Sequence, residues 1–395
     1  MTLDEQLSAI LLGLEQDSLR RSLRALPTSG KYVEVDGQRL LNLAGNDYLA
    51  LSHHPKLIAA AQQAVTAHGV GAGASRLVTG SLAVHAQAER DVANLKHADA
   101  ALLLSTGYMA NLAVFSALAR PGDLVCQDKL NHASLIDAAG HCRAAVRTYP
   151  HLQAAKPERL LAKHQAESPD RRRFIVTDSV FSMDGDCADL PALCDLADRY
   201  NAVLVVDDAH GTGVLGETGA GLAEHQGVAR RVYDCGAGGI VISTASKALG
   251  GMGGIVTGSE PVIEMLVNRA RPVLYSTAIA PVQAAVVSAA VAVLRDEPWR
   301  RERLAELCRS ARTRLSALGW RGLDQSIATP ILPMVVGSAE AALALAQRMY
   351  EQGLLGVAIR PPTVAPGAAR VRLTLRADLE EMELADAIEK IGPPA

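Results

Sequence analysis

Short apolar runs alternate with helical stretches along most of this chain, and that alternation limits the folds open to it. From about residue 55 onward, helical patterns separate five strand-like runs, Ala101–Leu104, Leu124–Cys126, Phe174–Thr177, Val203–Val206 and Ile240–Ile242. Strands that are spaced by helices form a mostly parallel sheet with both faces covered. The sequence therefore predicts an α/β fold with a mostly parallel central sheet flanked by helices.

The two ends of the chain show different patterns. Leu3, Leu7 and Leu14 recur at helical spacing ahead of Pro27, which indicates a helical N-terminal arm. After an alanine-rich helix at 281–294, a charged helix, two strands and a closing helix indicate a smaller α+β domain. We therefore expect an arm over residues 1–40, a large α/β domain over 41–292 and a small C-terminal domain over 293–395.

Charge and composition favour a small-molecule partner. The net charge of -3 gives no general attraction for nucleic acid or for anionic membranes. The apolar stretch at 278–294 is short for a membrane span and rich in alanine, so it predicts a buried helix. The six cysteines form no Cys-x-x-Cys pair and follow no signal peptide, so we expect reduced thiols, a cytoplasmic location and no metal site.

Lys247 differs from the other seven lysines, for which we expect solvated surface positions (31, 56, 96, 129, 156, 163 and 390). It is the only charged residue between Asp234 and Glu260, and glycines and small residues surround it. Partial desolvation there would lower the pKa of its amine and favour nucleophilic attack or Schiff-base formation. The segment alone is equally compatible with a lysine that reaches water or caps a helix.

A second candidate element is the apolar strand that ends in Asp207 and Asp208, with His210 close behind. Ligands of open α/β sheets gather at the carboxyl ends of strands, where these side chains would lie. A carboxylate against a pyridine nitrogen keeps that nitrogen protonated, which is a role for Asp207 if the cofactor is pyridoxal 5′-phosphate (PLP). The alternatives are a helix-capping aspartate, our preferred interpretation of Asp208, and a structural histidine.

Two further segments are suited to a phosphate. Gly107 and Tyr108 stand where a strand turns into a helix, and Thr244 and Ser246 add hydroxyls beside Lys247. The glycine-rich segment from Gly69 follows a helical stretch, which argues against a dinucleotide-binding loop.

Taken in order, these elements make the chain resemble the α-oxoamine synthases, a family of PLP enzymes of fold type I. The resemblance covers nearly the whole length. Its most specific stretches are Asn46-Asp-Tyr-Leu-Ala-Leu-Ser, Gly71-Ala-Gly-Ala-Ser-Arg, Asn131-His-Ala-Ser-Leu, Phe181-Ser-Met-Asp-Gly-Asp, Val206-Asp-Asp-Ala-His-Gly-Thr-Gly, Thr244-Ala-Ser-Lys and Ile359-Arg-Pro-Pro-Thr-Val.

The resemblance implies a role for each matching residue. Three are implied to be catalytic: Lys247 as the Schiff-base lysine, Asp207 as partner of the pyridinium nitrogen, and His132 stacked on the cofactor ring. Further cofactor contacts are implied for Ser182 and His210 near the phenolic oxygen, and for Gly107, Tyr108 and Thr244 around the phosphate. Substrate contacts are implied for Arg360 at an amino-acid carboxylate and for Arg20, His132 and Thr363.

The resemblance also implies a reaction, the decarboxylative condensation of L-alanine with a pimeloyl thioester in biotin biosynthesis, with Lys247 as the base at the α-carbon. The thioester carrier could be CoA or acyl carrier protein. The implied assembly is a homodimer, in which Ser276 and Thr277 approach the phosphate bound by the other chain. Two alternatives stay open: a sister enzyme that uses glycine or serine with another acyl-CoA, and a nucleotide-binding or regulatory module without chemistry.

Overall fold

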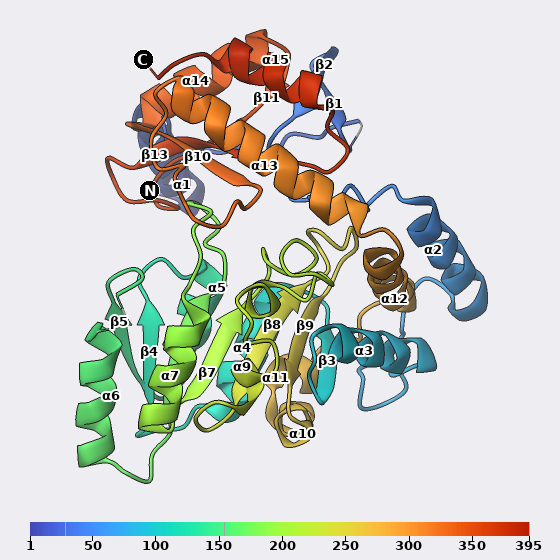
Figure 1. The fold of residues 1–395 in the computed structure, drawn as a ribbon, viewed down its shortest axis with the longest axis vertical. Coiled ribbons are helices and arrows are strands. Elements are labelled where there is room, and N and C mark those ends of the chain that lie inside the picture. Colours follow the sequence, from blue (N-terminus) through green and yellow to red (C-terminus); the bar gives the residue numbers. More distant parts are fainter. Residues whose placement is uncertain (28, 154, 395) are drawn as a thin grey trace. The chain divides into compact units, whose positions relative to one another are not determined.

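The computed structural model describes residues 1–27, 29–153 and 155–394. The chain forms two compact units (Figure 1). The larger unit comprises Asp47–Ser182 and Asp186–Glu302, and the smaller unit comprises Met1–Asn46, Met183–Gly185 and Arg303–Ala395. The first 46 residues thus group with the C-terminal segment, because strand β2 (Gln38–Asn42) pairs in parallel with β11 (Leu354–Leu355). The sequence did not indicate this pairing.

The larger unit is built on a seven-stranded sheet in the order β3-β9-β8-β7-β6-β4-β5. Its strands are β3 (Ala100–Leu104), β4 (Leu124–Asp128), β5 (Ala145–Tyr149), β6 (Arg173–Asp178), β7 (Val203–Asp207), β8 (Gly239–Thr244) and β9 (Gly254–Gly258). β9 pairs antiparallel with β3 and with β8, and the other neighbouring strands of this sheet pair in parallel. All five predicted runs are strands of this sheet, so the predicted α/β fold with a mostly parallel sheet is confirmed.

The sequence did not predict β5 and β9. β5 lies at the edge of the sheet and is mostly exposed or half-buried, so it lacks the continuous apolar run of a central strand. β9 begins and ends in glycine, a residue that is depleted in strands.

Helices cover the two faces of this sheet. Alternate strand residues such as Leu104, Val125 and Ile242 share one apolar core with α4 (Gly107–Leu118), α5 (Ala133–His141) and α10 (Glu260–Arg269). The opposite face carries α6 (Ala155–Glu167), α7 (Leu190–Tyr200) and α9 (Arg231–Asp234). Figure 1 shows α7 and α9 in front of the strands and α4 behind them. Both faces are therefore dry, which explains why the central strands are apolar throughout.

The remaining helices of the larger unit flank the β3 side of the sheet or connect its strands. α2 (Pro55–His68) and α3 (Ala83–Leu95) both contact α12 (Pro281–Asp296), which is the predicted alanine-rich helix. The short helices are α8 (Leu222–His225) and α11 (Arg271–Leu274). Within the described ranges, no helix is both long enough and apolar enough to cross a bilayer.

The smaller unit contains two three-stranded sheets and four helices among its described residues. One sheet joins β1 (Tyr32–Val35), β2 and β11, and the other joins β10 (Ile331–Gly337), β13 (Ala369–Thr374) and β12 (Val357–Ile359). Helix α14 (Ala339–Glu351) packs against strands of both sheets, and α15 (Glu381–Ile391) packs against α14. Most of α13 (Trp299–Ala317) also belongs to this unit. The N-terminal helix α1 (Leu3–Gln16) has no buried residue.

Candidate active site

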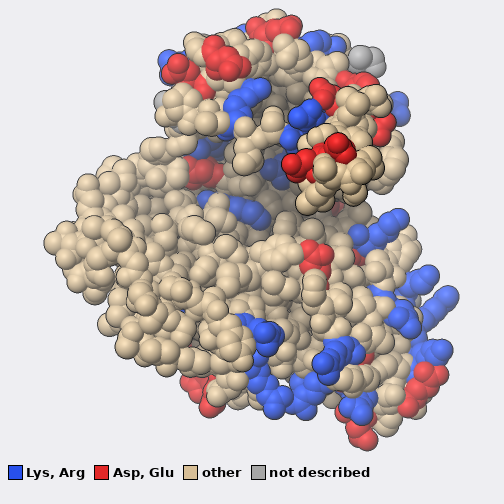
Figure 2. Space-filling model, turned by 180° about the vertical axis from the view of Figure 1, so that it is seen from behind, with Lys and Arg blue, Asp and Glu red and all other residues tan. Residues whose placement is uncertain are grey.

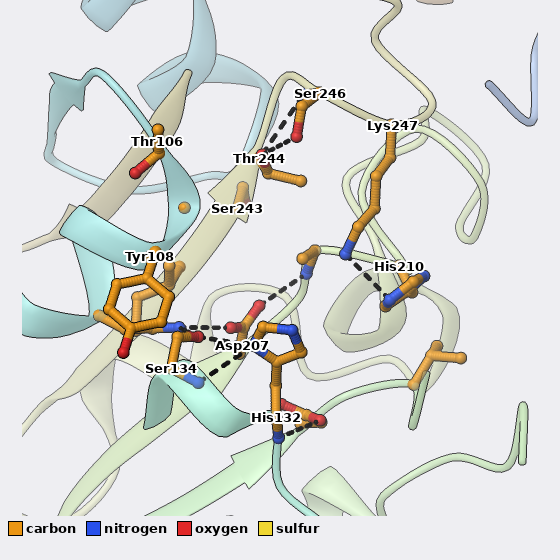
Figure 3. Close-up of a pocket in the computed structure, with 16 residues that line it drawn as sticks. Thr106, Tyr108, His132, Ser134, Asp207, His210, Ser243, Thr244, Ser246 and Lys247 are labelled. Carbon is orange, nitrogen blue, oxygen red and sulfur yellow. Dashed lines mark hydrogen bonds between the residues drawn. The ribbon is translucent and has the colours of Figure 1, made fainter. Parts of the chain in front are cut away.

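A cavity of about 250 Å³ opens at the carboxyl ends of the central strands of the larger unit. β6 ends at Asp178 and β7 ends at Asp207, and Ile242 lies near the end of β8. The register of the sheet places these three residues side by side. This edge is where ligands bind in open α/β sheets. Figure 3 shows four of the lining side chains around the cavity: Asp207 and His210 from the end of β7 and the turn after it, Lys247 from the loop after β8, and His132 from the start of α5.

Lys247 lies in the loop that follows β8, and its amine approaches a histidine. Its Nζ is 2.9 Å from His210 Nε2, and His210 Nδ1 is 2.7 Å from the hydroxyl of Tyr48. Tyr48 is fully buried and His210 is nearly so, which fixes the imidazole between the tyrosine and the lysine. The lysine is half-buried and faces the cavity, so it combines a positioned amine with access for a small molecule.

Asp207 is held by a side-chain network on the opposite side of the cavity. Asn111 Nδ2 donates to Asp207 Oδ2 at 2.8 Å, and the Ala209 amide donates to Oδ1 at 3.0 Å. Asn111 also donates to Ser134 Oγ at 2.8 Å, and Ser134 Oγ lies 2.6 Å from His132 Nδ1. The carboxylate is therefore fixed in one orientation, with each donor supplied by a different element.

His132 caps α5 and exposes its ring to the cavity. Its Nδ1 accepts from the Ser134 amide at 3.2 Å, so the network assigns the ring proton to Nε2. Burial lowers the pKa of His132; the charge of Asp207 opposes this shift and that of Lys247 adds to it. A neutral imidazole is suited to stacking on an aromatic ligand.

Asp178 adds a second carboxyl group beside Asp207. Burial raises its pKa well above the usual range, the charge of Asp207 raises it further, and Lys247 opposes the rise. Within the described part of the chain, Asp178 Oδ1 and Asn111 Oδ1 are buried without a hydrogen-bond partner. A protonated ring nitrogen would donate a hydrogen bond in a region where carboxylate and amide oxygens otherwise outnumber the donors.

The other end of the cavity is lined by hydroxyls and by the start of α4. Thr106 caps the helix by accepting from the Met109 amide at 3.1 Å, which leaves the amides of Gly107 and Tyr108 at the first turn for another acceptor. Thr244 Oγ1 and Ser246 Oγ lie 2.8 Å apart on the same side, and Tyr108 donates to Asp137. A helix N-terminus with two hydroxyls is a site for a phosphate.

The donor set fits PLP. The cavity offers an amine for the aldehyde carbon, a carboxylate for the ring nitrogen, an imidazole for the ring face and a helix N-terminus for the phosphate. Its volume is near the lower end of the range for small-molecule pockets, which suits one aromatic ring with a phosphate better than a dinucleotide.

Comparison with known proteins gives the family. The family model for class I and II aminotransferases matches residues 38–391. An 8-amino-7-oxononanoate synthase from Stutzerimonas stutzeri is 44% identical over 94% of this chain and 92% of its own, and one from Pseudomonas putida is 46% identical over 90% and 88%. The chain belongs to the 8-amino-7-oxononanoate synthase family. The solved serine palmitoyltransferase of S. paucimobilis, with a bound PLP–myriocin aldimine, superposes with a TM-score of 0.90 at 25% identity over 99% of this chain and 98% of its own.

Membership in the synthase family confirms the predicted resemblance, and the structure locates each predicted site residue. The residues predicted for the cofactor that line the cavity are Gly107, Tyr108, His132, Asp207, His210, Thr244 and Lys247. Ser182 is not among the lining residues, although Val180 of the same segment is. Arg20, Arg360 and Thr363 belong to the smaller unit, so their substrate roles remain predictions.

Those three residues lie close together within the smaller unit. Arg360 donates to the carbonyl of Ser18, and its second terminal nitrogen lies 3.5 Å from the carbonyl oxygen of Arg20. The Thr363 amide donates to the Arg360 carbonyl at 3.1 Å. Arg20 itself pairs with Glu15 at 2.6 Å. The arm after α1 and the segment after β12 thus form one cluster.

The structure also corrects one prediction and adds residues that the sequence analysis missed. Lys96, predicted at the surface, is 4% exposed and forms an ion pair with Asp208. Asn111, Ser134 and Asp178 support the cavity without having been singled out. Asn111 carried a signal, since it is the single amide in α4, a helix whose other residues are mostly apolar.

Proposed function

We propose that this chain catalyses the decarboxylative condensation of L-alanine with a pimeloyl thioester to give 8-amino-7-oxononanoate, carbon dioxide and a free thiol, in biotin biosynthesis. The observation that carries this proposal is a cavity-facing lysine held beside His210, together with a fixed Asp207, in a chain that is 46% identical to a synthase of that name. Free thiols at all six cysteines suit the cytoplasmic location that we infer.

PLP is the cofactor that the donor set and the family support. When bound, it withdraws electrons from the α-carbon of an amino acid, which makes the α-proton removable. Asp207 would keep a proton on the pyridine nitrogen of the bound cofactor, because its carboxylate is held in one orientation by hydrogen bonds from Asn111 and Ala209. Asp178, with its raised pKa, adds a buried acceptor without requiring a second full negative charge.

Lys247 is proposed to serve twice, as the attachment point of the cofactor and then as the base that moves the α-proton of alanine. His210, fixed by Tyr48, holds the lysine amine in place between these roles. His132, in its neutral form, would cover the ring face of the bound cofactor and keep water away from the reacting carbon. Gly107, Tyr108 and Thr244 orient the phosphate.

The substrate contacts are proposed for the Arg20, Arg360 and Thr363 cluster of the smaller unit. A planar guanidinium suits a carboxylate, which it can bind through two parallel hydrogen bonds. Burial lowers the pKa of Arg360, and the charge of Arg21 acts in the same direction. Its Nε is buried without a partner within the described residues, so this donor is available to an incoming carboxylate.

We further propose a homodimer. Figure 2 shows a broad face of the larger unit with almost no charged side chains, and the same unit exposes Val70, Leu77, Val78 and Tyr275. α1 also exposes Leu3, Leu7 and Ile10. Sedimentation of the PLP-loaded protein tests the assembly, and an active species that is solely monomeric would contradict it.

The reaction is tested with alanine, glycine and serine, each combined with pimeloyl-CoA, pimeloyl-acyl carrier protein and palmitoyl-CoA. The expected result is carbon dioxide release and a product of the mass of 8-amino-7-oxononanoate with alanine and a pimeloyl thioester. The likeness to serine palmitoyltransferase makes serine with palmitoyl-CoA the second candidate pair. Preferred turnover of that pair would replace the proposal, and a colourless protein that takes up no PLP would end it.

A further inference from the structure

Lys96 and Asp208 form a buried ion pair that has no role in the proposed contacts with the cofactor or the substrate. Lys96 follows the last residue of α3, and only 3% of each charged side chain is exposed. Lys96 Nζ donates to Asp208 Oδ2 at 2.7 Å, to Thr212 Oγ1 at 3.1 Å and to the carbonyl of Ala220. All three hydrogens of the ammonium are therefore engaged.

Asp208 is fixed from every side. Its Oδ2 also accepts from Thr212 Oγ1 at 2.8 Å, and its Oδ1 accepts from the Leu222 amide at 3.3 Å. The backbone closes on the carboxylate through two glycines, since a Cβ on Gly211 or Gly221 would overlap it. The sequence around this aspartate thus leaves room for its carboxylate and for little else.

The turn that this ion pair holds carries three residues that line the cavity, Asp207, Ala209 and His210. Asp208 follows Asp207, and the amides of Gly211 and Thr212 donate back to the Asp208 carbonyl at 3.2 and 2.9 Å. These bonds close a tight turn with His210 inside it. The ion pair lies at the base of the turn, and the imidazole of His210 stands 2.9 Å from Lys247 Nζ.

A contribution to folding stability alone does not explain why the chain buries such an ion pair. Burying two charges costs desolvation free energy that their attraction roughly offsets, and well-packed apolar residues serve a core as well or better. A lysine with three fixed acceptors does, however, select one conformation of the backbone that supplies them. The pair is therefore better suited to fixing geometry than to holding the fold.

We propose that Lys96 is a positioning residue, which acts through Asp208 and Thr212 to fix the Asp207–Thr212 turn and thereby the placement of His210 against Lys247. Displacing reacting groups by as little as 1 Å can cost about 100-fold in rate. Small movements of this turn would therefore change the position of His210 against the Lys247 amine, although Lys96 itself is not among the residues that line the cavity.

The test uses PLP-loaded Lys96→Met and follows the visible absorbance of the bound cofactor against pH. The midpoint of that titration is expected to move by about one unit, and kcat with alanine to fall roughly 10- to 100-fold with little change in the KM of the thioester. Lys31→Met is the matched control, because Lys31 pairs with Glu383 at 2.6 Å in the smaller unit. It should lower the melting temperature without moving the midpoint.

Two further variants separate positioning from folding. Lys96→Met/Asp208→Leu removes both charges, and we expect it to regain stability while the absorbance midpoint stays displaced. Thr212→Val is isosteric and keeps the ion pair, and a smaller displacement in the same direction is expected even if Lys96→Met does not fold.

An unmoved midpoint in Thr212→Val, or a double variant that restores both stability and midpoint, would overturn the positioning role. The absorbance measurements need bound PLP but no acyl substrate. They therefore still decide the role of Lys96 if the proposed condensation, on which the kinetic measurement rests, proves wrong.

Discussion

The cavity of the larger unit and the Arg360 cluster of the smaller unit are built in contrasting ways. In the cavity, side chains from separate strands and helices bind one another, as in the chain of contacts from Asp207 through Asn111 and Ser134 to His132. In the cluster, Arg360 donates to backbone carbonyls of the arm. The first arrangement fixes functional groups before any ligand arrives, whereas the second leaves a buried donor for one. The contrast suggests that cofactor and substrate residues will respond differently to substitution.

The strongest test of the cavity is Lys247→Ala. We expect a folded protein that lacks the visible absorbance of covalently attached PLP and has lost at least about 10⁴-fold in turnover, because both the attachment point and the base are gone. Absorbance spectra and product formation measure the two effects. Near-normal turnover in this variant would remove the cavity from the reaction altogether.

The Asp207→Asn variant tests whether the carboxylate keeps the ring nitrogen of the cofactor protonated or only packs against the ring. The amide has nearly the same shape, so PLP should still bind, but it cannot hold a proton on the ring nitrogen. Loss of such an electrostatic contribution costs about 10²- to 10³-fold. Exchange of the α-proton of alanine in deuterated water measures it directly, and an unchanged exchange rate would refute the electronic role.

The contrast between the two regions also explains what the sequence could predict. Strand ends were predictable because buried runs such as Val203–Val206 are continuous and the residues that follow them share one edge of the sheet. Asp178 was missed although it ends β6, since a strand-terminal aspartate is common and its raised pKa depends on burial and on the charge of Asp207, which only the fold brings beside it. Lys96 was misjudged for the same reason, because Asp208, Thr212 and Ala220 reach it from more than a hundred residues away.

His151 tests how much the charge on a histidine beside the end of β4 contributes to the stability of the larger unit. Its ring nitrogens lie 2.9 Å from Asp128 and 2.8 Å from Asp186. Burial alone would lower its pKa, but the hydrogen bonds to the two carboxylates outweigh it and raise the pKa to about 9. Because this folded-state value exceeds that of the unfolded chain, the stabilisation is complete below about pH 6.5 and is lost as the pH rises through about 9.

The expected contribution is at most about 3 kcal/mol. Urea unfolding of the protein and of His151→Gln between pH 6 and 10 measures it, and the difference in unfolding free energy between the two should shrink as the pH rises. A difference that stays constant over that range would show that His151 is not charged in the folded protein.

Arg360→Ala should give the smallest effect and the one most specific to substrate. Removing a charge-assisted hydrogen-bond donor costs roughly 1.5 to 3 kcal/mol, so KM for alanine should rise about 10- to 100-fold. The visible absorbance of bound PLP should be unchanged, because the residues proposed to hold the cofactor lie in the other unit. Arg321→Ala, an exposed arginine of the same unit, is the control for a general loss of positive charge. If Arg360→Ala lost PLP while keeping its KM for alanine, the division of labour between the two regions would be wrong, and Arg360 would belong with the cofactor residues.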